Sequence, residues 1–123
     1  MIYTASQLET FTRNIFIKMG STAQDAETAA KVLISADLRG VDSHGVARLS
    51  GYVRLWEKER LNATPQVKII HETPSTAVVD GDLGAGLVVA PKAMAIAIEK
   101  ARTAGSGWVA VQNSNHFGIA GYH

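Results

Sequence analysis

Apolar residues recur at three- and four-residue spacing through the first sixty positions, a pattern typical of amphipathic helices. The first run is preceded by two overlapping capping boxes, Thr4 with Gln7 and Ser6 with Glu9. The three runs end at Gly20, at Gly40 and in the charged stretch at 57–60. The sequence therefore predicts three helices, whose apolar faces include Leu8, Phe11, Ile15 and Met19; Ala26, Ala29, Ala30, Leu33 and Ala36; and Val46, Leu49, Tyr52, Val53 and Trp56.

The pattern changes after Pro65. Residues 67–71 and 76–80 are rich in β-branched residues, and the segment between them fits a hairpin turn. A glycine-rich segment then leads into a helix through residues 93–101, in which Pro91 is tolerated in the first turn or as a kink. Gly105 ends this helix, and residues 108–111 read as a buried strand. We therefore expect an α/β (α+β) fold: a three-helix segment over 1–65, then the start of a mixed β-sheet with a packing helix over 66–123.

Gly84 and Gly86 lie between a predicted strand and a predicted helix, in the order that a dinucleotide-binding fingerprint requires. Val89 occupies the place of the third glycine, and no clear acidic residue closes a second strand about twenty residues further on. A flexible turn that lets the chain reverse between strand and helix explains the same residues. The sequence therefore favours a turn over a Rossmann-type nucleotide site.

The charge balance narrows the classes of partner. Twelve Lys and Arg against eleven Asp and Glu give a net charge of +1, which disfavours nucleic acid, including a helix-turn-helix module in the first sixty residues. No apolar run reaches the ~18–20 residues of a membrane span, and the chain begins without a secretory signal pattern. The absence of cysteine excludes disulfides, thiolate metal sites and a cysteine nucleophile. We expect a cytoplasmic protein with no membrane partner.

A sheet of three strands with one helix is thin for a chain that is 46% hydrophobic, and the last predicted strand is followed by a loop over residues 113–123. We therefore expect an N-terminal portion of a longer enzyme, with the remainder further along the same chain or on a second chain. On its own, this portion is expected to expose apolar surface and to be inactive.

Residues 42–48 carry the first candidate chemistry. Ser43 and His44 follow the second predicted helix, and Arg48 lies one helical turn after His44. A guanidinium can grip a carboxylate while a nearby imidazole transfers a proton, so this group suits a carboxylate-bearing substrate. The alternative is that Asp42 or Ser43 caps the third helix and His44 merely packs.

The second candidate segment is Asn115-His116-Phe117-Gly118, just beyond the end of a predicted strand. Ligands bind at that edge of open α/β sheets, so His116 is a second proton-transfer candidate. The alternative is a loop histidine bonded to backbone. The four histidines show no metal-ligand spacing; His71 reads as a strand residue, and we expect no metal site.

Three segments together resemble the malate/L-lactate dehydrogenase family of the second type, which includes sulfolactate and ureidoglycolate dehydrogenases. The first segment is DLRGVDSHGVARL at 37–49, the second runs from Val79 to Gly86, and the third is NSNHFGIAGY at 113–122. They occur in the family's order and span nearly the whole chain. Two separate histidine-bearing motifs make the resemblance far more specific than either motif alone.

The resemblance implies an NAD- or NADP-dependent oxidoreductase that acts on a small 2-hydroxy or 2-keto acid, usually as a homodimer, with a fold unrelated to the Rossmann domain. It implies that His44 and His116 transfer protons, that Ser43, Arg48 and Asn115 bind substrate, and that His44, Arg48 and Gly118 contact the cofactor. The sequence leaves open which histidine is the acid, with a slight preference for His44 because Ser43 can orient it. The alternative function is a non-catalytic binding or regulatory domain that retains the front half of this fold.

Overall fold

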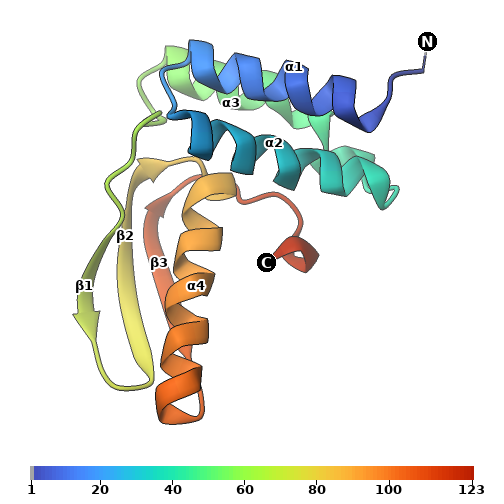
Figure 1. The fold of residues 1–123 in the computed structure, drawn as a ribbon. Coiled ribbons are helices and arrows are strands. Elements are labelled where there is room, and N and C mark those ends of the chain that lie inside the picture. The colour runs from blue at the N-terminus through green and yellow to red at the C-terminus, as the bar shows by residue number, and fades with distance from the viewer. Residues whose placement is uncertain (1) are drawn as a thin grey trace.

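The computed structural model describes residues 2–123 and consists of a helical layer above a sheet with one packed helix (Figure 1). The helical layer contains α1 (Ala5–Lys18), α2 (Ala23–Leu38) and α3 (Leu49–Glu57). The lower layer contains β1 (Lys68–Glu72), β2 (Thr76–Gly84), α4 (Gly86–Ala104) and β3 (Trp108–Ser114). This arrangement confirms the predicted fold class, with three helices before a mixed sheet and its packing helix.

Helix α1 begins where the first capping box predicts. The Thr4 hydroxyl accepts a hydrogen bond from the Gln7 backbone at 3.2 Å, and Gln7 Oε1 accepts one from the Thr4 backbone at 2.9 Å. The apolar face differs from the prediction: Phe16 is 1% exposed, whereas Phe11 is 55% exposed. The turn that faces α2 thus contains Phe16 and Met19, and Phe11 lies outside the core.

Helix α2 lies between the other helices and the sheet layer, and it contacts both α1 and α4. Its buried positions are mainly alanines with Val32, Leu33 and Ile34, so neighbouring elements approach it closely. One hydrophobic core joins the two layers, since Phe16 and Leu33 cluster with Tyr52 of α3 and Leu87 of α4. The division of the chain at residue 65 stays a prediction.

The sheet has the order β1-β2-β3 and is mixed. Strands β1 and β2 are antiparallel, which confirms the predicted hairpin, and β2 and β3 are parallel and joined by α4. Strand β2 continues to Gly84, beyond its predicted end. Helix α4 covers one face of the sheet in Figure 1, and Gly105 ends it with a left-handed φ of 83°, as predicted.

Residues 108–111 form a strand as predicted, but the prediction that this strand is buried is wrong. Strand β3 forms, but Trp108 is 74% exposed and most side chains of the strand are open. The reason is its place at one edge of the sheet, where it pairs only with β2 within residues 2–123. An apolar run identifies a strand but does not say which layers cover it.

Pro91 does not lie in the first turn of its helix, which was one of the two predicted positions. Helix α4 begins at Gly86, so Pro91 lies inside the helix beyond its first turn. Proline there removes the hydrogen bond to the carbonyl one turn earlier.

No helix within residues 2–123 combines the length and the apolarity that crossing a membrane would require.

Candidate active site

The loop between α2 and α3 carries the first candidate residues. It consists of two short 3₁₀ turns, Asp42–His44 and Val46–Arg48, joined by Gly45. Asp37 of α2 accepts a hydrogen bond from the Val46 backbone at 2.8 Å. A Cβ at Gly45 would collide with the Asp37 carboxylate, so a larger residue there would displace the carboxylate. The end of α2 therefore sets where the loop lies.

Within this loop, Ser43, His44 and Arg48 form one connected group. Ser43 Oγ lies 2.9 Å from His44 Nδ1, and Arg48 Nε donates to the Ser43 carbonyl at 2.7 Å. The terminal guanidinium nitrogens of Arg48 make no further hydrogen bond within residues 2–123. Helix α3 and both 3₁₀ turns have no side-chain cap, so neither Asp42 nor Ser43 plays the capping role of the alternative interpretation.

His116 lies in the loop after β3, beyond the strand's C-terminal end, as predicted. Asn115 anchors this loop: its backbone donates to the Gly84 carbonyl at 3.0 Å, and its side-chain amide donates to the Leu83 carbonyl at 2.9 Å. A Cβ at Gly86 would collide with the backbone of residues 115 and 116, so the loop lies directly on the start of α4. The structure thus gives Asn115 a positioning contact, and its substrate role stays a prediction.

The fold brings the two candidate histidines together from distant parts of the sequence. The ring centroids of His44 and His116 are 5.3 Å apart, with the ring planes inclined at 38°. Arg48, on the same loop as His44, lines one groove with His116. Ser43, His44, Arg48 and His116 therefore share one region of the surface, which also contains the anchored Asn115 backbone.

Tyr52 is a site residue that the sequence interpretation placed only in the apolar face of a helix. Its hydroxyl lies 2.9 Å from His116 Nδ1 and 3.0 Å from the His116 carbonyl oxygen. The signal that could have found it is its spacing, because Tyr52 lies four residues after Arg48 at the start of the same helix. A helical residue at that spacing shares a face with Arg48.

The environment favours uncharged forms of both His116 and Tyr52. Partial burial lowers the pKa of His116, and electrostatic repulsion from Arg48 and from the neighbouring His44 lowers it further. Burial raises the pKa of Tyr52 well above its ordinary value, an effect that Arg48 only partly opposes. At neutral pH the tyrosine therefore carries its hydroxyl proton and His116 is mostly neutral.

A groove of about 440 Å³ opens beside these residues and is rich in positive charge. Four basic side chains line it, and no acidic one does. Such a lining attracts carboxylates and other anions. The residues that form this groove are Arg48, Gly51, Tyr52, Arg54, Leu55, Lys58, Arg60 and His116.

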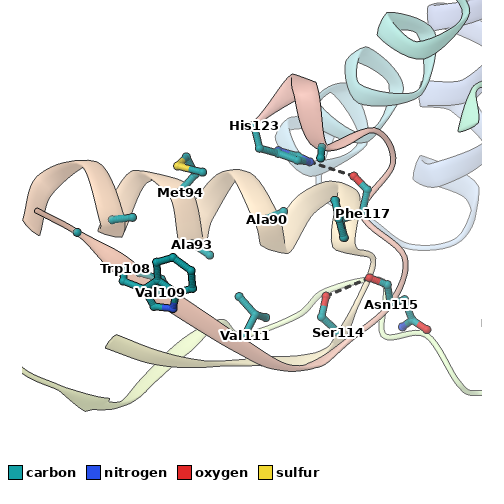
Figure 2. A pocket seen from close by; sticks show the side chains of 13 residues that line it. Ala90, Ala93, Met94, Trp108, Val109, Val111, Ser114, Asn115, Phe117 and His123 are labelled. Atoms are coloured by element: carbon teal, nitrogen blue, oxygen red, sulfur yellow. Dashed lines mark hydrogen bonds between the residues drawn. The ribbon is translucent and has the colours of Figure 1, made fainter. Parts of the chain in front are cut away.

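A second, larger groove of about 600 Å³ lies between α4 and β3 and has a different character (Figure 2). Its lining is mainly apolar and includes Met94, Trp108, Val111 and Phe117. His123 lies at one end, where its Nε2 is 3.0 Å from the Phe117 carbonyl oxygen. Of the predicted site residues only Asn115 lines this groove, so it is separate from the paired histidines.

The space beside Gly84 and Gly86, the glycines of the disfavoured nucleotide fingerprint, is filled by other residues of the chain. A Cβ at Gly84 would lie 2.7 Å from Pro65, and the region of Gly86 is filled by the 115–116 backbone. Gly118 is buried with a φ of 83°, and its Cα faces Val32 and Leu87 of the core. These glycines therefore allow the chain to pack closely against itself, as the turn interpretation predicts. No three acidic or histidine side chains within residues 2–123 are placed to hold a metal ion.

Comparisons with known proteins place this chain beside a set of dehydrogenases. Residues 3–123 match the family model described as malate/L-lactate dehydrogenase. A malate dehydrogenase of Pyrococcus abyssi is 52% identical over 117 residues, which are 95% of this chain and 32% of that protein. An L-sulfolactate dehydrogenase of Methanocaldococcus jannaschii is 47% identical over 110 residues, which are 89% of this chain and 32% of that protein.

Solved structures agree with the sequence matches. The sulfolactate dehydrogenase from Methanocaldococcus jannaschii superposes with a TM-score of 0.97 at 44% identity, covering 99% of this chain and 36% of that one. The malate dehydrogenase from Pyrococcus horikoshii superposes with a TM-score of 0.96 at 43% identity, covering 99% and 35%. The chain thus spans about a third of the length of the relatives it matches.

Proposed function

Because this chain belongs to the malate/L-lactate dehydrogenase family, we propose that it supplies proton-transfer and substrate-binding residues to an NAD- or NADP-dependent 2-hydroxyacid dehydrogenase. The observation that carries this proposal is the pairing of His44 and His116 beside Arg48. A 2-keto acid presents a carboxylate next to a carbonyl, and this group presents a guanidinium next to two imidazoles. The substrate is a small 2-hydroxy or 2-keto acid, and no nucleic acid or membrane takes part.

The open guanidinium of Arg48 binds the substrate carboxylate. Its Nε is already held by the Ser43 carbonyl, so the planar group is oriented and its terminal nitrogens remain for a ligand. The other basic residues of the groove strengthen the local positive potential. Ser43 contributes by orienting the neighbouring imidazole, and Asn115 contributes by holding the loop of His116 in place.

In the direction of reduction, His44 gives a proton to the oxygen at C2 as negative charge develops there, and it takes that proton back in the oxidation. We assign the donor role to His44 because Ser43 Oγ lies 2.9 Å from its Nδ1 and can orient the ring beside Arg48. When bound, the nicotinamide cofactor supplies or accepts the hydride at C2. The ring centroid of His116 is 5.3 Å from that of His44, which places His116 within reach of a substrate held by His44.

The described residues offer contacts for the nicotinamide end of the cofactor, and the glycine-rich turn is taken up by packing within the chain. His44 and Arg48 are open enough to contact the nicotinamide, whereas the turn at Gly84 and Gly86 is filled by the chain itself. Gly118 is buried, so it acts on the cofactor site through its amide contact with His116. We propose that the remainder of the enzyme supplies the other cofactor contacts, in a cytoplasmic homodimer.

The test is turnover by the protein in its natural length. We expect oxidation of NADH or NADPH in the presence of small 2-keto acids, with one monocarboxylic and one dicarboxylic acid compared. Loss of activity in both His44→Gln and Arg48→Ala, with folding retained, would place the reaction at this site. A folded protein that binds a keto acid but turns over neither acid with either cofactor would favour the non-catalytic binding or regulatory role.

A further inference from the structure

The hydrogen bonds around His116 determine which of its ring nitrogens carries the proton. The backbone N–H of Gly118 donates to Nδ1 at 3.2 Å. A backbone amide can only donate, so Nδ1 must offer a lone pair. A neutral imidazole carries a single ring proton, and that proton is therefore on Nε2.

Tyr52 belongs to the same arrangement. Its hydroxyl oxygen is 2.9 Å from Nδ1 and 3.0 Å from the carbonyl oxygen of the same histidine. The hydroxyl proton of Tyr52 thus lies between two acceptors of His116, its Nδ1 and its carbonyl oxygen. The hydroxyl group therefore holds the imidazole ring in place relative to the His116 backbone. Tyr52 is 3% exposed and packs against Phe16, with ring centroids 6.1 Å apart, so the hydroxyl is held in a fixed place.

His44 has no comparable constraint. Its Nδ1 lies 2.9 Å from Ser43 Oγ, and a serine hydroxyl can either donate or accept. The bond is therefore compatible with both tautomers of His44 and with its charged form. The two histidines of the site consequently differ: the proton position is set for His116 and free for His44.

From this geometry we propose that Tyr52 and the Gly118 amide hold His116 as the neutral Nε2–H tautomer, which presents its N–H to the oxygen at C2 of the substrate. A neutral imidazole in this role polarises a carbonyl without giving up its proton. Tyr52 is a positioning residue, because it acts through His116. The role toward substrate rests on the function proposed above, whereas the tautomer does not.

The charges around His116 support the same state. A charged ring would place an Nδ1 proton against the Gly118 N–H, so two donors would face each other. Partial burial and electrostatic repulsion from Arg48 and His44 also lower the pKa of His116. Nε2 makes no hydrogen bond within residues 2–123, which leaves it available to a ligand in the adjoining groove.

The direct test is nitrogen NMR of the protein in its natural length, labelled at histidine, at neutral pH. We expect His116 Nδ1 to show the signal of an unprotonated nitrogen and Nε2 that of a proton-bearing one. Exposed His71 on β1 is the internal control and should show the ordinary mixture of tautomers. A proton on Nδ1, or a charged His116 ring, would overturn the inference. No turnover is required, so this result is independent of the proposed function.

The variant Tyr52→Phe tests the positioning role. It retains the ring that packs against Phe16 and removes only the hydroxyl. We expect the His116 signals to shift toward the mixture seen for His71, and kcat to fall about three- to tenfold, the worth of one neutral hydrogen bond. The cofactor KM should change by less than about twofold.

Tyr3→Phe is the matched control, since it removes a hydroxyl from an exposed residue near the N-terminus and should alter neither readout. If Tyr52→Phe leaves the His116 signals unchanged, Tyr52 does not position the ring, whether or not activity falls. A fall in kcat accompanied by the shifted signals supports the inference. If the wild-type protein reduces no keto acid but shows the Nε2–H signal, the tautomer stands and the proposed function fails.

Discussion

The carboxylate of Asp37, in the last turn of α2, accepts a hydrogen bond from the backbone N–H of Val46 at 2.8 Å. This bond fastens the loop that carries Ser43 and His44 to the helix at the centre of the molecule. Gly45 lies inside the same contact, where any Cβ would overlap the carboxylate. The end of one helix therefore sets the position of His44 relative to the rest of the site.

Gly45→Ala should disturb both stability and activity. The new methyl group displaces the Asp37 carboxylate and strains its bond to Val46, so the free energy of unfolding should fall by about 1–3 kcal/mol. Activity should fall with it because His44 moves. Gly51→Ala is the control for stability: its Cβ meets no atom within 4 Å, and alanine favours the helix by up to ~1 kcal/mol. Denaturant unfolding measures the stability of both variants. A Gly45→Ala variant as stable as the wild-type protein would contradict the role of this contact.

Arg48→Lys should weaken substrate binding while leaving the fold intact. Lysine keeps the charge but loses the planar fork and the anchoring bond from Nε to the Ser43 carbonyl. We expect kcat/KM for the keto acid to fall about 10- to 100-fold, the range for a hydrogen bond between charged groups. Arg102→Lys on the exposed end of α4 is the matched control. Steady-state kinetics at several substrate concentrations measure the change, and unchanged kinetics would make Arg48 an ordinary surface cation.

The two histidines should respond differently to replacement by glutamine. His44→Gln removes the proton donor, so the rate should fall by about 10²–10⁴-fold with nearly unchanged cofactor affinity. His116→Gln removes a hydrogen-bond donor and should act more on substrate binding. The pH–rate profile of each variant separates the roles, with His71→Gln as a control on exposed β1. If His44→Gln keeps the wild-type turnover and acidic limb, the donor is His116.

His116 should also make the protein less stable in mild acid. Because folding lowers the pKa of His116, the unfolded chain binds more protons once the pH falls below the ordinary value of 6.5. The contribution of neutral His116 to the free energy of unfolding is present at neutral pH. It is lost as the pH falls from the ordinary pKa through the lower pKa that His116 has in the folded protein. The denaturant midpoint of His116→Gln should therefore change less between neutral pH and pH of about 5 than the wild-type midpoint. Identical pH dependence in the two proteins would contradict this assignment.

The 123-residue chain on its own should associate through its open apolar surface. Strand β3 is an edge strand with Trp108 exposed, and an apolar groove runs beside it (Figure 2). Val111→Lys should reduce association in sedimentation velocity, because a charge on an edge strand opposes pairing. Leu38→Lys, at an exposed position on α2, is the control. A wild-type chain that is monomeric and catalytically active would contradict the expectation.

Local signals were sufficient for much of the secondary structure. The pairing of Thr4 with Gln7, the left-handed end of α4 at Gly105 and the turn between β1 and β2 all depend on residues close together in sequence. Hydrogen bonds and φ preferences of this kind act over a few residues. They could therefore be predicted before any tertiary contact was known.

Burial was predicted less well because it depends on which layers cover an element. Phe16 rather than Phe11 is in the core, since α2 approaches that face of α1. Trp108 is exposed because β3 lies at the sheet edge. Both residues are apolar, and the pattern alone does not distinguish the covered face from the open one.

For the candidate site, the sequence by itself determined the two histidine motifs, their order and the family they indicate. Only the tertiary structure decided that His44 and His116 lie side by side, and that Tyr52 contacts His116. The reason is physical: His44 is placed by a loop tied to α2, and His116 by a loop anchored on the β2–α4 turn. The distance between them is set by the packing of two layers through one core, which no local signal in the chain specifies.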